Sequence, residues 1–159
     1  MTDHLIIDGW NVCWKIPEIA PDIPDRSRAA RQKFNSLVKK YQADKKVIFR
    51  IVYDGQPDIL AEESTKDPNI LFSKYPQKAD QLIISFLQKQ RKPQQWTVIT
   101  SDRELAHKAR AQDARILSSE DFISRLRRNK PKPKEQSGKY DAFLSRQEID
   151  YWLQKFKEK

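Results

Sequence analysis

Short apolar runs alternate along this chain with longer segments whose apolar residues recur at helical spacing. The short runs are rich in β-branched and aromatic residues, which is typical of buried strands. They cover residues 5–7, 47–53, 70–72, 96–100 and 115–117. The longer segments predict helices over residues 26–42, 78–91, 102–112 and 119–128. Strands that alternate with helices of about ten or more residues indicate an α/β domain with a mainly parallel sheet.

Serine followed three residues later by an acid marks the expected start of three helices. The pairs are Ser101 with Glu104, Ser118 with Asp121, and Ser145 with Glu148. The third pair opens a last amphipathic helix at the end of the chain, whose apolar stripe includes a tryptophan. We expect this stripe to dock on the α/β body, with a partner surface as the alternative.

The composition changes after residue 128. Residues 129–144 contain prolines and several lysines, which predicts an exposed basic linker. The chain therefore divides into an α/β domain over 1–128, a linker over 129–144 and a helix over 145–159.

Scarce glycine, cysteine and histidine exclude several classes of protein. The three glycines are too far apart to form a dinucleotide-binding loop or a phosphate loop. One cysteine and two histidines exclude a disulfide framework and a Cys-rich zinc site. The N-terminus does not resemble a signal peptide, and no apolar run approaches the roughly 18 residues of a membrane span. We therefore expect a cytoplasmic protein.

The chain is strongly basic. It carries 31 Lys and Arg against 22 Asp and Glu, which gives a net charge of +9. Such a charge favours a polyanionic partner, most simply nucleic acid, although many basic proteins are merely soluble.

Three of the predicted strands end in an aspartate. These are Asp8, Asp54 and Asp102, and Asp80 falls in the first turn of the helix after residues 70–72. In an open parallel sheet, ligands bind beyond the carboxyl ends of the strands. If the first strand is central, its neighbours can bring all four side chains into one cleft.

Carboxylates gathered in one cleft repel each other unless a cation neutralises them or some take up protons. A hard divalent ion such as Mg²⁺ or Mn²⁺ suits oxygen ligands and bridges readily to phosphate. The alternative is a local role for each residue. Asp102 can cap a helix, Asp80 can complement a helix dipole, and Asp8 and Asp54 can belong to turns before glycine.

Other residues are candidates for contact with a polyanion or with the metal site. Asn11 follows Asp8 closely enough to reach the same cleft, and Trp10 and Trp14 can stack on bases or pack in the core. The expected cationic residues flank the aspartates, and a solvated surface is the alternative for each of them. They are Arg28, Arg31, Lys39 and Lys40 on the polar face of the helix 26–42, Lys74, Lys78, Arg103 and the six Lys or Arg of residues 125–134.

Four segments, in order, resemble a known family. They read L-I-I-D-G-W-N at 5–11, V-Y-D-G at 52–55, F-S-K-x-x-x-K-A-D-Q-L-I at 72–83 and V-I-T-S-D at 98–102. Their order and spacing resemble the YacP-like NYN-domain proteins of the PIN-like nuclease superfamily, from about residue 3 to residue 128. This chain has Trp10 where the family commonly has tyrosine, and Gln81 where an acid often follows A-D.

The resemblance implies a PIN-like three-layer α/β fold and a divalent-metal site. The site would use Asp8, Asp54, Asp80 and Asp102, with Asn11 as an auxiliary residue. It also implies endonucleolytic cleavage of single-stranded or loop RNA, including messenger RNA associated with ribosomes. Because Gln81 removes a carboxylate, the number of metal ions and the level of activity stay open.

We therefore predict a metal-dependent endoribonuclease. The first alternative is an RNA-binding adaptor with a weakened or inactive cleft, for which Gln81 is the sequence hint. A phosphatase with an aspartyl nucleophile is disfavoured, because Asp8 is followed by Gly-Trp-Asn without a second aspartate two residues on.

Overall fold

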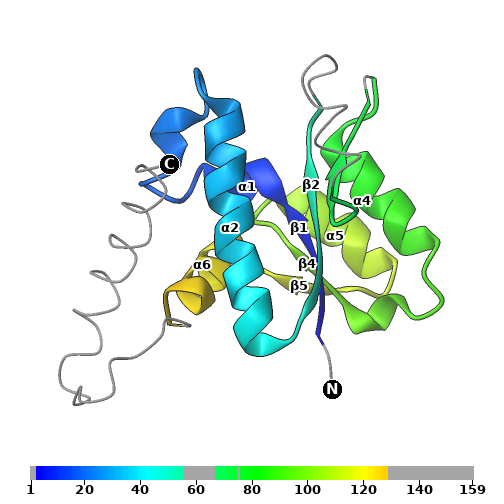
Figure 1. Cartoon of the computed structure of the whole chain (residues 1–159). Helices are drawn as coiled ribbons and strands as arrows, with labels where there is room; N and C mark the ends of the chain where they lie inside the picture. The colour runs from blue at the N-terminus through cyan, green and yellow to red at the C-terminus, as the bar shows by residue number, and fades with distance from the viewer. Residues whose placement is uncertain (1–2, 56–66, 75, 129–159) are drawn as a thin grey trace, which may run out of the picture.

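A five-stranded parallel sheet forms the centre of the molecule in a computed structural model that describes residues 3–55, 67–74 and 76–128 (Figure 1). The strands are β1 (His4–Asp8), β2 (Ile48–Tyr53), β3 (Ile70–Phe72), β4 (Trp96–Ile99) and β5 (Arg115–Leu117). Their order is β3-β2-β1-β4-β5, and every neighbouring pair is parallel. The α/β class is confirmed, and β1 is the central strand.

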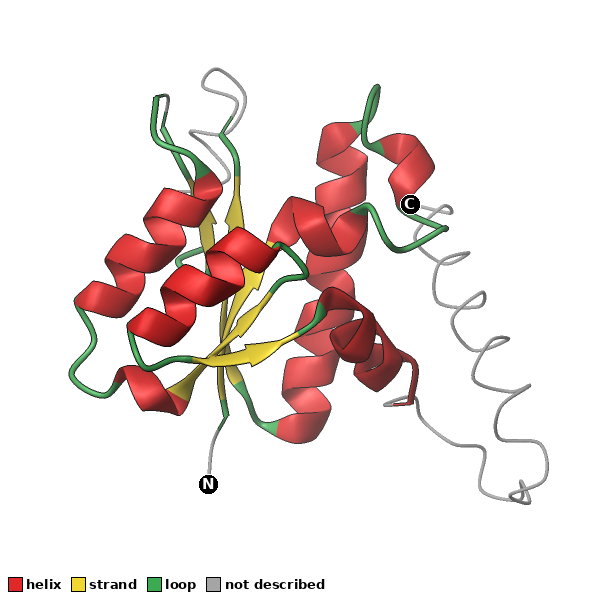
Figure 2. Cartoon of the chain, turned by 180° about the vertical axis from the view of Figure 1, so that it is seen from behind, coloured by secondary structure: helices red, strands yellow, loops and turns green. Residues whose placement is uncertain are grey.

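Helices cover both faces of this sheet, which gives three layers. Figures 1 and 2 show α4 and α5 together on one face and α1, α2 and α6 on the other. The helices are α1 (Gly9–Cys13), α2 (Ser27–Lys45), α4 (Ala79–Gln88), α5 (Arg103–Ala111) and α6 (Ser119–Arg128), with short 3-10 helices η1 (Ala20–Asp22) and η2 (Pro93–Gln95).

Alternate side chains of the central strand enter two separate cores. Leu5 and Ile7 pack with the α1, α2 and α6 side, whereas Ile6 packs with the α4 and α5 side. Successive residues of a strand point to opposite faces, so a strand covered on both faces must be apolar at every position. This is why residues 5–7 of β1 and 51–53 of β2 appear in the sequence as continuous apolar runs rather than as alternating ones.

Helix α2 buries the apolar stripe that its sequence predicts. Phe34, Leu37, Val38 and Tyr41 are all buried against the sheet and α6. The helix continues three residues past the expected end and stops where Lys46 adopts a left-handed conformation, with φ of 56°. Such a conformation is a common way for a helix to end.

Three short described elements have no signal in the sequence. Helix α1 spans five residues, and η1 and η2 span three each, so none is long enough to show helical periodicity. The expected linker over 129–144 and helix over 145–159 lie outside the described residues. In the part of the chain that the structure describes, no helix is long and apolar enough to cross a membrane.

Candidate active site

Asp8 lies where β1 passes directly into α1. The chain turns there against β2, and Gly9 makes this close approach feasible. A Cβ atom on Gly9 would lie 2.5 Å from Cε1 of Tyr53 and 3.0 Å from the carbonyl oxygen of Val52. The glycine that follows Asp8 in the sequence therefore has a packing role, which sets the aspartate at the carboxyl end of the central strand.

The Asp8 carboxylate is poorly solvated and surrounded by other acids. Its pKa is raised from 3.8 to about 6. Burial is the main cause and the negative charges of Asp102, Asp54 and Asp80 add to the rise, whereas a hydrogen bond from Thr100 opposes it. The Thr100 hydroxyl donates this bond to Oδ2 of Asp8 over 2.9 Å. The same Thr100 oxygen accepts the backbone N–H of Asp102 at 3.1 Å, so it links the ends of β1 and β4.

Asp54 follows β2 and reaches across to the start of α4. Its Oδ1 accepts the backbone N–H of Ala79 at 2.6 Å and the hydroxyl of Ser73 at 3.3 Å. Gly55 allows the Ser73 backbone to approach, because a Cβ atom there would lie 1.9 Å from the Ser73 carbonyl oxygen. Asp54 is thus held by the strand beside it and by the helix that carries Asp80.

Asp102 caps helix α5. Its Oδ1 accepts the backbone N–H groups of Glu104 at 2.9 Å and Leu105 at 3.3 Å. The expectation that Ser101 caps this helix is wrong by one residue. The Ser101 hydroxyl instead donates to Glu120 at 2.5 Å and accepts the N–H of Ser119 at 3.0 Å, which joins the end of β4 to α6.

Asp80 lies in the first turn of α4, as predicted, and is half-buried. Its Oδ1 accepts the neighbouring backbone N–H of Gln81 at 2.9 Å. The Gln81 side chain turns back to accept the N–H of Lys78 at 2.9 Å, so the residue that replaces the family's acid stabilises the start of this helix.

The structure brings all four predicted aspartates to one edge of the sheet. In Asp8, Asp54 and Asp102, one carboxylate oxygen is anchored by a protein hydrogen bond, and the second accepts none from the described residues. The local capping role is therefore compatible with a role in binding a ligand. Each anchored oxygen fixes the side chain, and the other oxygen is available to a ligand.

The donor set suits a hard divalent cation, because it consists of the carboxylate oxygens of four aspartates, three of which raise the pKa of the fourth, Asp8. Among residues 3–55, 67–74 and 76–128, however, no three Asp, Glu, His or Cys residues converge closely enough to form a metal-binding group. Mg²⁺ commonly uses one or two carboxylates and keeps several waters. The arrangement therefore fits an ion held partly through water and substrate, and not one enclosed by the protein.

Asn11 supports the cleft by holding two loops together. Its side-chain oxygen accepts the backbone N–H of Ser101 at 2.9 Å and the hydroxyl of Ser119 at 2.7 Å. Since that oxygen is already used twice, Asn11 acts as a positioning residue for the loop that carries Asp102. Thr100, Ser73 and Ser119 are further supporting residues for which the sequence gives no strong signal.

Arg31 is not on the solvent-exposed face of α2, and the expectation that placed it there is wrong. It is only 2% exposed, and its guanidinium carbon lies 6.0 Å from the ring centre of Trp10 and 5.6 Å from that of Phe72. Trp10 also packs on Tyr53, with ring centres 4.9 Å apart. Trp10 is thus part of an aromatic cluster behind Asp8, and it is half-buried rather than fully available for stacking.

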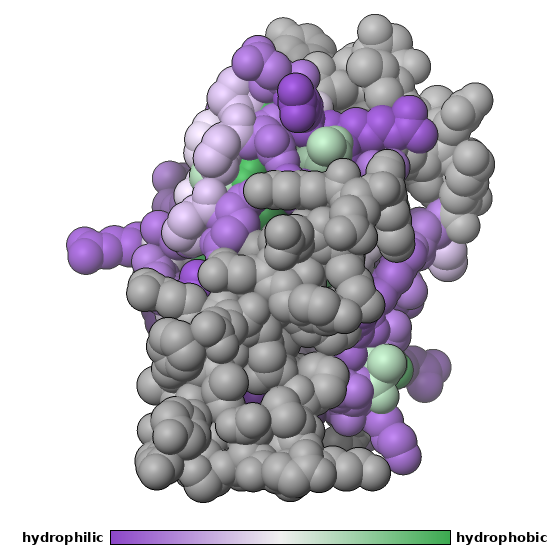
Figure 3. Space-filling view, turned by 60° about the vertical axis from the view of Figure 1, so that its left-hand side comes forward, coloured by the Kyte–Doolittle hydropathy of each residue, from purple (hydrophilic) through white to green (hydrophobic). Residues whose placement is uncertain are grey.

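Several of the other expected cationic residues lie at the surface of the described part of the chain, whereas those of 129–134 lie outside it. Lys74, Lys78 and Arg103 are exposed and adjoin the aspartates in sequence, and Arg28 is exposed on α2. Lys39 forms an ion pair with Asp67, with 3.0 Å between Nζ and Oδ2, so its charge has a partner within the protein. On the side of the molecule in Figure 3, the described surface is mainly hydrophilic.

A cavity of about 460 Å³ opens beside Asp102. It extends from the end of β4 along α5, and it is lined by Thr100, Ser101, Asp102, Arg103, Ala106, His107, Arg110, Ile116 and Ser118. The cavity combines apolar walls with cationic side chains and touches one of the four aspartates. A nucleotide unit combines an apolar base with a charged phosphate and so matches this lining.

Comparisons with known proteins identify the fold and the family. No curated protein sequence gives a significant match. The fold resembles the crystal structure of Rae1 (YacP) from Bacillus subtilis, with a TM-score of 0.67 and 20% identity over 99% of this chain and 83% of that one. The W164L mutant of the same protein gives a TM-score of 0.65 and 21% identity over 78% and 74% of the two chains. The family model for the YacP-like NYN domain matches residues 5–159, further than the four motifs reach. This chain belongs to the family of YacP-like NYN domains, whose domain is nuclease-like.

Proposed function

We propose that this protein is a divalent-metal-dependent endoribonuclease that hydrolyses phosphodiester bonds of single-stranded or loop RNA. The observation that carries the proposal is the meeting of four aspartates at one edge of the sheet. Their charges add to burial in raising the pKa of Asp8 to about 6. A protein with a net charge of +9 that keeps such an acidic cleft is suited to draw in a polyanion and present it to a metal ion.

Asp8, Asp54, Asp80 and Asp102 would hold Mg²⁺ or Mn²⁺, together with water and phosphate oxygens of the RNA. When bound, the metal ion supplies an activated water and stabilises negative charge on the phosphodiester. Thr100 fixes the rotamer of Asp8, and the main chain of α5 fixes that of Asp102. Fixed carboxylates reduce the reorganisation required when substrate binds.

Cationic side chains next to the cleft would hold the RNA against its acidic centre. Arg103 and Arg110 line the cavity beside Asp102, and Lys74 and Lys78 precede Asp80. Their contacts to phosphate would be independent of base sequence. The family extends the proposal to cytoplasmic messenger RNA on ribosomes, so translating ribosomes belong in the test beside naked RNA.

The test is cleavage of a labelled single-stranded RNA by the full chain with Mg²⁺ or Mn²⁺, with EDTA as the metal-free control. We expect Asp8→Asn and Asp102→Asn to abolish cleavage. Asp25→Asn, which removes an exposed aspartate outside the cleft, should leave it unchanged. Cleavage that persists in EDTA or in both cleft variants, with naked RNA or with ribosomes, would refute the proposal.

An RNA-binding adaptor is the second candidate, and Gln81 is the observation in its favour. This side chain caps α4 where the family often has an acid, so the cleft has one carboxylate fewer. Tight RNA binding without cleavage on either substrate, unchanged by Asp8→Asn, would favour the adaptor.

A further inference from the structure

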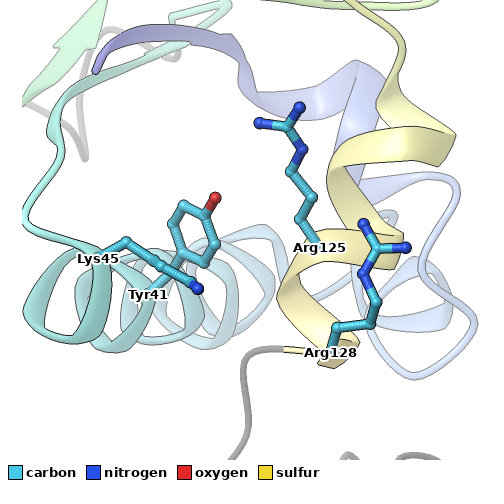
Figure 4. Close-up of a pocket in the computed structure, with 4 residues that line it drawn as sticks. All are labelled: Tyr41, Lys45, Arg125 and Arg128. Atoms are coloured by element: carbon cyan, nitrogen blue, oxygen red, sulfur yellow. The ribbon is translucent and has the colours of Figure 1, made fainter. Parts of the chain in front are cut away.

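A cationic site separate from the cations beside the aspartates lies on the opposite side of the molecule, between the last turns of α2 and α6. A cavity of about 310 Å³ opens there, lined by Tyr41, Lys45, Arg125 and Arg128. Figure 4 shows the four side chains around this space, two from each helix. Residues four apart in α2 and three apart in α6 share a helix face, which is why each helix contributes a pair.

None of the described residues that line this cavity is an acid. Within the described part of the chain, Lys45, Arg125 and Arg128 form no ion pair, so three positive charges lie around one space without a counter-charge. Cations in the last turn of a helix interact favourably with its dipole, by about 0.3–1 kcal/mol each. The helix dipole accounts for the presence of each cation in its own helix. It does not account for cations of two helices lying around the same cavity.

Tyr41 adds a neutral hydroxyl to these three cations. Its ring is only 6% exposed and packs edge-on against Phe122, with ring centres 5.7 Å apart. The hydroxyl points into the space between the helices (Figure 4) and has no hydrogen-bond partner among the described residues. A ligand with acceptor oxygens in the cavity would satisfy this hydroxyl and the cations together.

We propose that Tyr41, Lys45, Arg125 and Arg128 form a second phosphate-binding site, which holds a phosphodiester of the RNA that is not cleaved. Guanidinium groups bind phosphate through two parallel hydrogen bonds, and lysine adds a point charge. The identity of the ligand as RNA rests on the proposed function. The site itself rests on the cavity, its three cations and the unpartnered hydroxyl.

The position of this site sets the length of RNA that could reach both places. Helix α2 ends just before β2 begins, and Asp54 follows the last residue of β2. The six residues of β2, at about 3.3 Å each, therefore separate the end of α2 from Asp54 by roughly 20 Å. At about 3.4 Å per phosphate of a stacked strand, RNA would need on the order of six nucleotides between them. Short fragments would then occupy one site and longer ones both.

The test is binding of a fluorescein-labelled oligoadenylate of about 12 nucleotides in EDTA, where no metal-dependent cleavage interferes. Arg125→Gln and Arg128→Gln should each weaken binding about tenfold and reduce the salt dependence by about 0.7 in slope. Arg127→Gln is the matched control, because Arg127 lies in the same turn of α6 but outside the cavity. Tyr41→Phe, which keeps the ring, should weaken binding about threefold.

If Arg127→Gln weakened RNA binding as much as the cavity variants do, the proposal would be overturned, because the loss of affinity would then follow from net charge alone. Unchanged binding in the cavity variants would also overturn it, as would equally strong binding of polyglutamate, which carries no phosphate. If the protein cleaves RNA, the cavity variants should raise KM and leave kcat unchanged. If cleavage is never seen while the binding pattern holds, the proposed function fails and the second site stands.

Discussion

Replacing Asp8 by asparagine is expected to stabilise the metal-free protein, although it removes a residue of the proposed active site. The pKa of Asp8 rises from 3.8 to about 6 in the folded state, with burial as the main cause. Each pKa unit corresponds to about 1.4 kcal/mol. A rise of about two units therefore lowers the free energy of unfolding at neutral pH by about 3 kcal/mol. Asparagine has nearly the same shape, can accept the Thr100 hydrogen bond and carries no charge.

The pH dependence follows from the direction of this pKa change. Because the folded-state pKa lies above the unfolded value, the folded protein holds an extra proton between about pH 3.8 and about 6. The wild type should therefore lose stability as the pH rises through this window. The advantage of Asp8→Asn should be largest above the window and disappear below it.

Urea denaturation in EDTA, near pH 7 and again at about pH 3.5, measures both effects. At 159 residues, each kcal/mol moves the melting temperature by about 2–4 °C, so a gain of several degrees is expected near neutral pH. Asp25→Asn is the control and should change the free energy of unfolding by less than about 0.5 kcal/mol. An Asp8→Asn variant no more stable than wild type near pH 7, or equally stabilised at both pH values, would refute the electrostatic reasoning.

Three further predictions concern the supports of the cleft. Gly55→Ala should destabilise the fold by about 1–3 kcal/mol and impair RNA cleavage, because the added Cβ would displace the Ser73 backbone beside Asp54; thermal melting and a cleavage assay check this. Asn11→Ala should cost about 1–3 kcal/mol by leaving two donors unsatisfied, and a melting temperature equal to wild type would contradict this. Mn²⁺ at about 100 times its Kd should stabilise the wild type by about 2.7 kcal/mol and Asp8→Asn by less, which calorimetry with and without the ion measures.

Local patterns in the sequence predicted most of the fold. The strands and the four longer helices follow from apolar spacing, which is set by the period of each element. The family motifs and the strand-end aspartates predicted the edge of the sheet at which the acidic side chains meet, because strands in a parallel sheet end at the same edge. The short helix α1 was missed, since five residues carry no period.

Other features depend on partners far apart in the chain. The position of Arg31 in the helix predicted that its side chain faces solvent, but two aromatic rings from other elements cover it. Ser101 has the spacing of a helix cap, but α6 offers Glu120 and Ser119 as its partners.

The sequence by itself determined the α/β class, the aspartates at the strand ends and the basic charge of the chain, because each depends on residue type and local spacing. Only the tertiary structure decided that β1 is central, so that three aspartates raise the pKa of a fourth, and that α2 and α6 enclose a cationic cavity. Strand order and helix packing bring together residues far apart in the chain, and these contacts leave no period in the sequence.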